Sequence, residues 1–114
     1  MTPSELVMSR GDQVPDLCDA RGRRIRLREL TALDTLRLLK LAGPHLSMNQ
    51  AWLSIATLAY AVTEIEGVPV PVPTSEAQIE AIVERLGDQA LTMIADSMDA
   101  RKESVAATKD NVGN

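Results

Sequence analysis

Residues 66–74 read EGVPVPVPT and lie between two segments of helical character. The stretch alternates like a β-strand, but its three prolines have no backbone N–H to donate. In an extended strand, alternate residues point their backbone groups to opposite edges, so the prolines would remove donors from one edge only. The stretch is therefore either a strand that pairs with a single neighbour, for which residues 23–28 are the expected partner, or a polyproline-type spacer between helices. In the first case its free edge would resist strand-to-strand aggregation.

Upstream of this stretch, the sequence predicts a β-hairpin over residues 14–28. Asp19-Ala20-Arg21-Gly22 is a turn signal, in which Gly22 can adopt a positive φ. The following sequence RIRLR, at 24–28, alternates polar and apolar residues with the period of a half-buried strand. Pro15 places the first strand at an edge of the sheet.

A first helix is predicted over residues 32–42. Thr31 and Asp34 have the spacing of a capping box at its start. Five leucines follow between positions 33 and 41, and Gly43-Pro44 ends the helix.

A second helix is predicted over residues 48–65, with Ser47 or Asn49 as its N-cap. Its middle is apolar nearly all round. A helix of this kind is either central in the core or shared with a partner.

A third helical region begins after Ser75, which has capping-box spacing with Gln78. Apolar residues then recur with helical spacing as far as Met98. At Gly87 the sequence allows one kinked helix or two short helices, and Asp88 as a new N-cap favours the break.

Length and composition predict one small domain, mainly α, as a bundle of three to four helices with an N-terminal β-hairpin. The chain has 114 residues, of which 45% are apolar, with no Phe, one Trp and one Tyr. Its core must therefore be largely aliphatic, which suits helices that pack on helices. We expect the domain to span residues 13–100, with a flexible arm over 1–12 and a flexible tail over 101–114.

No catalytic, cofactor or metal-binding pattern is present, so we do not expect an enzyme. His45 and Cys18 are the only residues of their types, and the glycines stand singly at the ends of elements. The N-terminus lacks the pattern of a signal peptide, and the apolar run 51–62 is too short to span a bilayer. These features predict a soluble intracellular protein in a reducing compartment.

Five arginines between positions 21 and 28 are the strongest charge feature. On a strand, Arg24, Arg26 and Arg28 would share one face. This face could be solvated, could bind an acidic protein partner, or could bind the phosphates of a nucleic acid. The formal net charge of −4 argues against a general nucleic-acid binder.

A partner-binding surface is also predicted on the second and third helices, unless core packing accounts for their apolar residues. The aromatic anchors available for it are Trp52 and Tyr60, and aliphatic and Met contacts can repack around different clients. The candidate partner-binding residues are Trp52, Ile55, Ala59, Tyr60, Val62, Ile79, Ile82, Val83, Arg24, Arg26 and Arg28.

The order of these features resembles the small tail assembly chaperones of tailed bacteriophages and prophages. The resemblance covers residues 14–98. It is carried by DARGRRIRLRELTALDTLRLLKLAG at 19–43, NQAWLSIATLAYAV at 49–62 and IEGVPVPVPTSEAQIEAIVERLGDQALTMI at 65–94. Proteins of this family have a Gly- and Pro-containing connection before a helix of the type IEA…RLGD.

The resemblance implies a chaperone in the host bacterial cytoplasm that binds the tape measure protein, keeps it soluble and promotes tail tube assembly. The tail tube protein and a second copy of the chain are further candidate partners, and no cofactor, nucleic acid or membrane is implied. We expect a client helix to lie in a groove along the second and third helices. The alternative is a small nucleic-acid-associated regulator that uses the arginine-rich hairpin.

Overall fold

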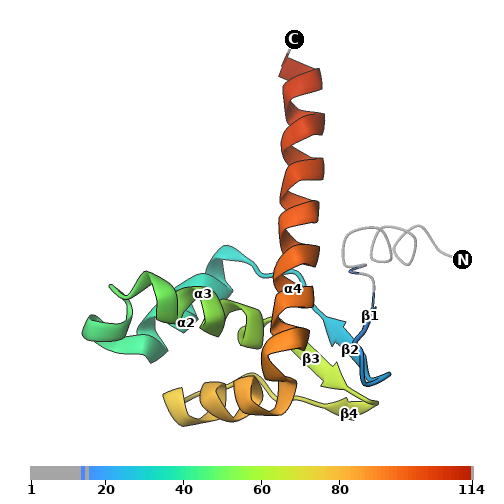
Figure 1. Ribbon diagram of the computed structural model, residues 1–114. Coiled ribbons are helices and arrows are strands. Elements are labelled where there is room, and N and C mark those ends of the chain that lie inside the picture. Colours follow the sequence, from blue (N-terminus) through green and yellow to red (C-terminus); the bar gives the residue numbers. More distant parts are fainter. Residues whose placement is uncertain (1–13, 15, 114) are drawn as a thin grey trace, which may run out of the picture.

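The computed structural model describes residue 14 and residues 16–113, with side chains as far as Arg101 (Figure 1). The described chain is small and mostly helical and contains a four-stranded antiparallel sheet. The predicted arm over residues 1–12 lies outside this part. The strands, in their order across the sheet, are β1 (Leu17–Cys18), β2 (Arg24–Leu27), β3 (Val62–Ile65) and β4 (Val68–Pro69), and the helices are α2 (Ala32–Leu46), α3 (Gln50–Tyr60) and α4 (Glu76–Gly113).

The predicted N-terminal hairpin is confirmed as β1 and β2. Leu17 pairs with Ile25. In β2, Ile25 and Leu27 are buried, while Arg24 and Arg26 are exposed. The turn is organised by Asp19, whose carboxylate accepts hydrogen bonds from the backbone N–H groups of Arg21 (3.0 Å) and Arg23 (2.9 Å). The strand alternation expected for this segment therefore separates a core face from a solvent face.

The prediction of one helix over residues 48–65 is wrong at its C-terminal end. α3 ends at Tyr60, and Val62–Ile65 forms β3, an inner strand that pairs with β2 on one side and β4 on the other. Three of its four residues are β-branched, which favours a strand over a helix. Glu66 and Gly67 both have positive φ (53° and 80°), as a two-residue type I′ turn requires, so β3 and β4 form a tight hairpin.

The proline-rich stretch begins as an edge strand, but its expected partner was wrong. β4 pairs with β3 through Ile65 and Val68 rather than with residues 23–28. The Val70 N–H donates to the carbonyl of Thr63 at 2.8 Å, so the alternate residues Pro69 and Pro71 face the outer edge. Prolines thus occupy the positions from which N–H groups would otherwise point outward, which blunts this edge.

Replacing Pro69 and Pro71 together by Thr should make the chain more prone to self-association. The double variant restores two outward N–H groups on an edge strand, and such groups template pairing with a second strand. Light scattering of concentrated samples checks this, with Val72→Thr as the control because it changes an exposed side chain and no backbone donor. A double variant that scatters no more than Val72→Thr would show that the prolines do not protect the edge.

Two glycines break the helices where the sequence predicts breaks. Gly43 (φ 81°, ψ 178°) interrupts α2 and Gly87 (φ 82°, ψ 164°) interrupts α4, in a region of backbone conformation that is nearly restricted to glycine. Before Gly87, α4 lies across the base of the molecule, and after Gly87 it rises away from the body (Figure 1). α4 stays helical as far as Gly113, and the flexibility predicted for residues 101–114 stays a prediction.

The helix N-termini follow the predicted capping patterns. Thr31 and Asp34 form a complete capping box on α2, and Asn49 accepts from the Trp52 N–H at the start of α3. Ser75 accepts from the Gln78 N–H at 3.2 Å at the start of α4. Each cap satisfies backbone donors that the first turn of a helix leaves unpaired.

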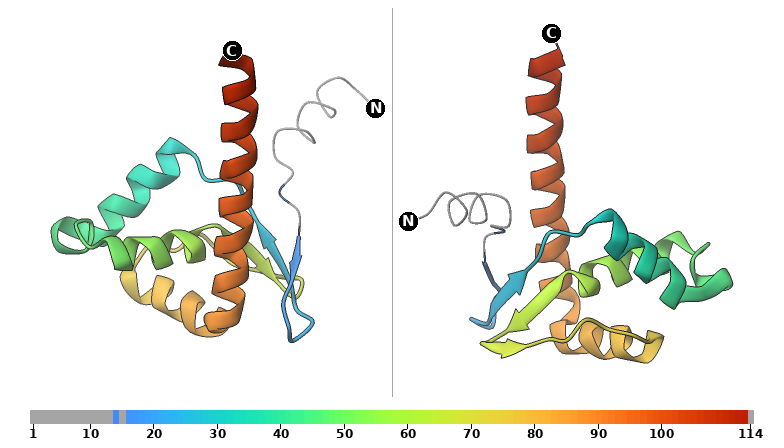
Figure 2. Two further views of the ribbon diagram at one scale, coloured as in Figure 1. Left: turned by 45° about the horizontal axis from the view of Figure 1, so that its top comes forward. Right: turned by 180° about the vertical axis from the view of Figure 1, so that it is seen from behind.

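Helices α2 and α3 lie on one side of α4, and the sheet lies on the other (Figures 1 and 2). α3 packs against α4, whereas α2 contacts mainly α3. The core is aliphatic apart from Tyr60, and its most deeply buried large side chains are Ile25, Ile65, Ile79, Leu86 and Ile94. α2 is consequently the least enclosed of the three helices, and its outer face is open.

Candidate partner-binding surface

Most of the apolar residues predicted to bind a partner lie in the core. Trp52 and Val83 are half-buried and pack against that core, and of the apolar candidates only Ile55 is exposed, at 47%. In this structure they therefore offer little surface to a client. Replacing the buried Ile82 by Asp would destabilise the fold, so this variant could not be used to measure binding alone. The buried candidates are Ala59, Tyr60, Val62, Ile79 and Ile82.

The exposed leucines lie instead on α2, where the sequence analysis proposed no site. Leu33 is 52% exposed and Leu36 is 64% exposed, while Leu38 is buried. At about 100° per residue, both exposed leucines lie roughly 140–160° around the helix from Leu38. Five leucines within nine positions are spread around more of the helix than one buried face can cover. This distribution could have predicted from the sequence that some leucines of α2 would be exposed.

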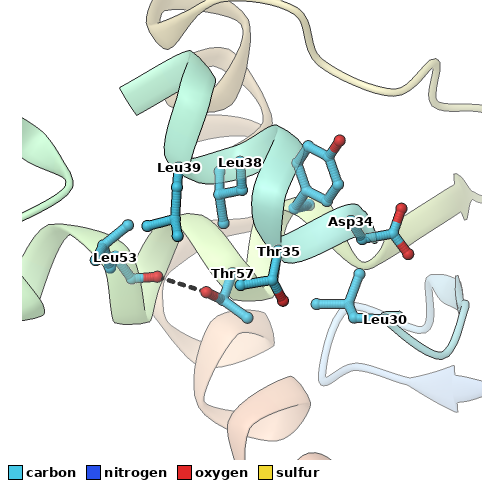
Figure 3. Close-up of a pocket in the computed structure, with 8 residues that line it drawn as sticks. Leu30, Asp34, Thr35, Leu38, Leu39, Leu53 and Thr57 are labelled. Atoms are coloured by element: carbon cyan, nitrogen blue, oxygen red, sulfur yellow. Dashed lines mark hydrogen bonds between the residues drawn. The ribbon is translucent and has the colours of Figure 1, made fainter. Parts of the chain in front are cut away.

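A pocket of about 100 Å³ lies between α2 and α3, and Leu39 of α2 is one of the residues that line it. Figure 3 shows Leu38 and Leu39 of α2 opposite Leu53 and Thr57 of α3. Leu36 and Leu39 are three residues apart and are therefore neighbours on the helix surface, so the exposed leucines and the pocket are continuous. We call the surface made by Leu33, Leu36, Leu39, Leu53 and Thr57 the α2–α3 face. It curves around α2, because Leu33 lies roughly 120° around the helix from Leu39 and points away from the pocket.

The Thr57 and Asp34 side chains at the pocket are already hydrogen-bonded within the chain. The Thr57 hydroxyl donates to the Leu53 carbonyl at 2.7 Å. The Asp34 carboxylate accepts from the Thr31 N–H (2.9 Å) and hydroxyl (3.1 Å) and pairs with Arg28 (3.3 Å). The pocket is thus effectively apolar, and an aliphatic group is the ligand that it suits.

The size of the pocket limits what can enter it. It is well below the roughly 300 Å³ at which small-molecule sites begin, and closer to the engineered apolar cavities of about 150 Å³ that hold one benzene. A single aliphatic side chain of a partner matches it. Within the part of the chain described by the structure, no three His, Cys, Asp or Glu side chains gather as metal ligands would.

Ile55 does not belong to the α2–α3 face. It is two residues from both Leu53 and Thr57, and therefore points about 160–200° around α3 from the pocket. Met48 is exposed in the turn between α2 and α3. These two apolar side chains are separate from the leucine surface, and isolated exposed apolar residues are normal on a globular protein.

The three predicted arginines lie along β2 and its end, and two of them are held by their own chain. Arg26 pairs with Asp16 (3.3 Å) and Glu64 (3.4 Å), and the hydrogen bond that it donates to Asp16, together with both negative charges, raises the pKa of Arg26. Arg24 is 3.9 Å from Asp16 and its side chain is 69% exposed. Arg24 is the freest of the three.

Arg28 links three elements. Its Nη2 donates to the carbonyl of Tyr60 at the end of α3 (3.0 Å), and its Nη1 pairs with Asp34 at the start of α2 (3.3 Å). The guanidinium also lies 4.9 Å from the centre of the Tyr60 ring, in a cation–π contact. These contacts make Arg28 a structural residue at the base of the α2–α3 face.

Arg23 is a structural residue that the sequence analysis missed. Its Nε contacts the Asp19 carboxylate at 2.7 Å, and its two terminal nitrogens donate to the carbonyls of Arg85 (2.8 Å) and Leu86 (2.7 Å). It therefore caps the helical segment that ends at Gly87. The alternation of the strand could have predicted this, because Arg23 is two residues before the buried Ile25 and therefore lies on the same face.

Two buried carboxylates should make folding stability depend on acid pH. Burial alone would raise the pKa of Asp19, but hydrogen bonds and charge from Arg23, with the Arg21 N–H, lower it overall. The pKa of Asp34 is lowered chiefly by the Thr31 N–H, then by the Thr31 hydroxyl and the charges of Arg28 and Arg37, against the opposing effect of burial.

Because both folded-state pKa values are lowered, their stabilisation is complete above the unfolded pKa of about 3.9 and is lost as pH falls through the folded values. The urea midpoint should therefore stay nearly constant from about pH 7 to 5 and fall below about pH 4. Asp34→Asn, which cannot titrate, should show a shallower fall. A midpoint that is unchanged at about pH 3 would contradict this account.

No protein-family model, curated protein or solved structure matches the chain. No described helix is both long and apolar enough to cross a membrane. The functional assignment accordingly rests on the α2–α3 face and on the resemblance in the sequence pattern.

Proposed function

We propose that the protein is a tail assembly chaperone of the bacteriophage and prophage type. It binds the tape measure protein in the host bacterial cytoplasm, keeps it soluble and promotes assembly of the tail tube around it. The observation that carries the proposal is the α2–α3 face, where Leu33 and Leu36 are more than half exposed and Leu36 neighbours Leu39 at the edge of an apolar pocket. The resemblance over residues 14–98 supplies the identity of the client.

The geometry of the face suits a helical client. Leu33 and Leu36 are three residues apart and form a ridge on α2. The adjacent pocket accepts one aliphatic side chain, as in helix-in-groove recognition, where residues spaced by three or four positions anchor the client. Apolar surface left open on a small domain is otherwise an aggregation liability, so a role in covering the apolar surface of a client accounts for its presence.

Co-expression with the tape measure protein of the same genome tests the proposal. The client should be largely insoluble when expressed alone and should become soluble and co-purify when this chain is present. An unrelated small helical protein, expressed at the same level, is the control for a general effect on solubility. A tape measure protein that stays insoluble, or becomes soluble without co-purifying, would contradict the proposal.

A nucleic-acid-associated regulator is the second candidate and has less support. Arg24 is free enough to contact phosphate, but Arg23, Arg26 and Arg28 are engaged within the chain. This candidate predicts binding to nucleic acid that weakens steeply with salt. The chaperone proposal predicts no binding to a short duplex at about physiological salt, and fluorescence polarisation with labelled DNA and RNA separates the two.

A further inference from the structure

The helical hairpin formed by α2 and α3 is a basic region in an acidic chain. The whole chain carries a formal charge of −4, with 16 acids against 12 Lys and Arg. Between residues 32 and 60 the only acid is Asp34, which is buried and paired with Arg28. The same region carries Arg37 and Lys40, which are both exposed. The surface charge of this hairpin is therefore positive.

The two cations lie next to the exposed leucines. Arg37 is four residues from Leu33, and Lys40 is four residues from Leu36, so each cation neighbours one leucine on α2. Within the described residues, neither Arg37 nor Lys40 forms an ion pair. The arrangement presents two apolar side chains and two positive charges that form no ion pair on one helix face.

We infer that the α2–α3 face binds an amphipathic helix that carries acidic residues beside its aliphatic ones. The aliphatic residues cover Leu33 and Leu36, while the acidic residues approach Arg37 and Lys40, which lie on the same side of α2. Charge complementarity of this kind gives orientation and specificity to an apolar contact. The inference rests on the proposed function for the site, and it specifies the chemistry of the client segment.

A second copy of the chain does not supply such a helix within the described residues. α4 exposes acids at Glu76, Glu80 and Glu84, but none of the exposed large apolar side chains lies on it. Those side chains are Leu33, Leu36, Met48, Ile55, Val68 and Val72. No helix among the residues whose exposure is described combines exposed acids with exposed large aliphatic side chains, and the proposal therefore takes a different protein as the partner.

Two synthetic helical peptides of about 20 residues, a length that can support an isolated helix, test the inference. Both carry the same leucine stripe, flanked by Glu in one peptide and by Lys in the other. By fluorescence anisotropy, the full chain should bind the Glu peptide about tenfold more tightly at low salt, and the preference should shrink at high salt. The variant R37E/K40E should reverse the preference, whereas the control R24E/R85E, which changes exposed arginines outside the face, should keep it.

Equal affinity for the two peptides, or a preference that R37E/K40E leaves unchanged, would overturn the inference. Binding to anionic phosphatidylglycerol vesicles in preference to both peptides would also overturn it.

The proposed function is tested separately by co-expression. If R37E/K40E still solubilises the tape measure protein as wild type does, the acidic client is wrong and the chaperone function stands. If the peptide preference appears but the tape measure protein is not bound, the inference that the face binds an acidic helix is supported and the proposed chaperone function is wrong.

Discussion

Replacing Arg23 by Ala is expected to lower the free energy of unfolding by about 3 kcal/mol, a large part of the stability of a small domain. The variant removes the hydrogen bonds to the carbonyls of Arg85 and Leu86 and leaves the buried carboxylate of Asp19 without its partner. Buried polar groups that lose their partners are costly because water cannot replace them. Urea unfolding monitored by circular dichroism measures the change.

Arg24→Ala is the matched control for this prediction. Its side chain is 69% exposed and its closest acid, Asp16, is 3.9 Å away, so its loss should cost no more than about 0.5 kcal/mol. Arg23→Lys should fall between the two, since it keeps the charge and loses the planar fork that reaches two carbonyls. If Arg23→Ala is as stable as Arg24→Ala, Arg23 does not hold the end of the helix at Gly87.

The double substitution Leu33→Gln/Leu36→Gln is expected to weaken client binding strongly without unfolding the domain. Completing the burial of two half-exposed leucines contributes roughly 2–3 kcal/mol, so affinity for the tape measure protein should fall roughly 30- to 150-fold. Gln has nearly the volume and helix propensity of Leu and adds no charge. The solubility of the co-expressed client, together with the dissociation constant of the purified complex, measures the effect.

Val68→Thr/Val72→Thr is the control for the leucine variant. These valines are 50% and 49% exposed, similar to the leucines, but lie in and after β4 rather than on the α2–α3 face. Both double variants should retain the wild-type circular dichroism spectrum. Equal losses of binding in the two would assign the effect to general surface apolarity and would remove the α2–α3 face from the account.

Features encoded by short-range signals could be predicted from the sequence. The hairpin turn at Asp19–Gly22, the capping box of Thr31 and Asp34, and the helix breaks at Gly43 and Gly87 all depend on residues within a few positions of one another. Glycine at a positive φ and a side chain that caps the next turn act locally, whatever the rest of the chain does. Each of these predictions is confirmed.

The sheet beyond the hairpin could not be predicted in the same way. Val62–Ile65 continues an apolar run that also suits a helix, and β3 is defined by pairing with β2, almost forty residues upstream. The turn at Glu66-Gly67 was a local signal for a hairpin, but the prolines that follow weakened it as evidence for a strand. Residues 62–65 suit a helix and a strand about equally by local preference, and their pairing with β2 and β4 determines that they form a strand.

The candidate site was harder still, because exposure depends on how elements pack. Tyr60 and Ile82 look like binding residues in the sequence but are buried in the core, while Leu33 and Leu36 look like core residues and are exposed. Helical periodicity identifies a face but not which element will cover it. Arg23 and Arg28 likewise seemed to belong to a charged surface and instead cap the ends of helices.

Hydrogen–deuterium exchange of the complex with the tape measure protein tests whether the client binds the α2–α3 face. Compared with the free chain, amides of residues 33–40 in α2 and 53–57 in α3 should exchange more slowly in the complex, while those of the β1–β2 hairpin should be unchanged. Protection confined to the hairpin or to α4, with α2 and α3 exchanging as they do in the free chain, would contradict the account.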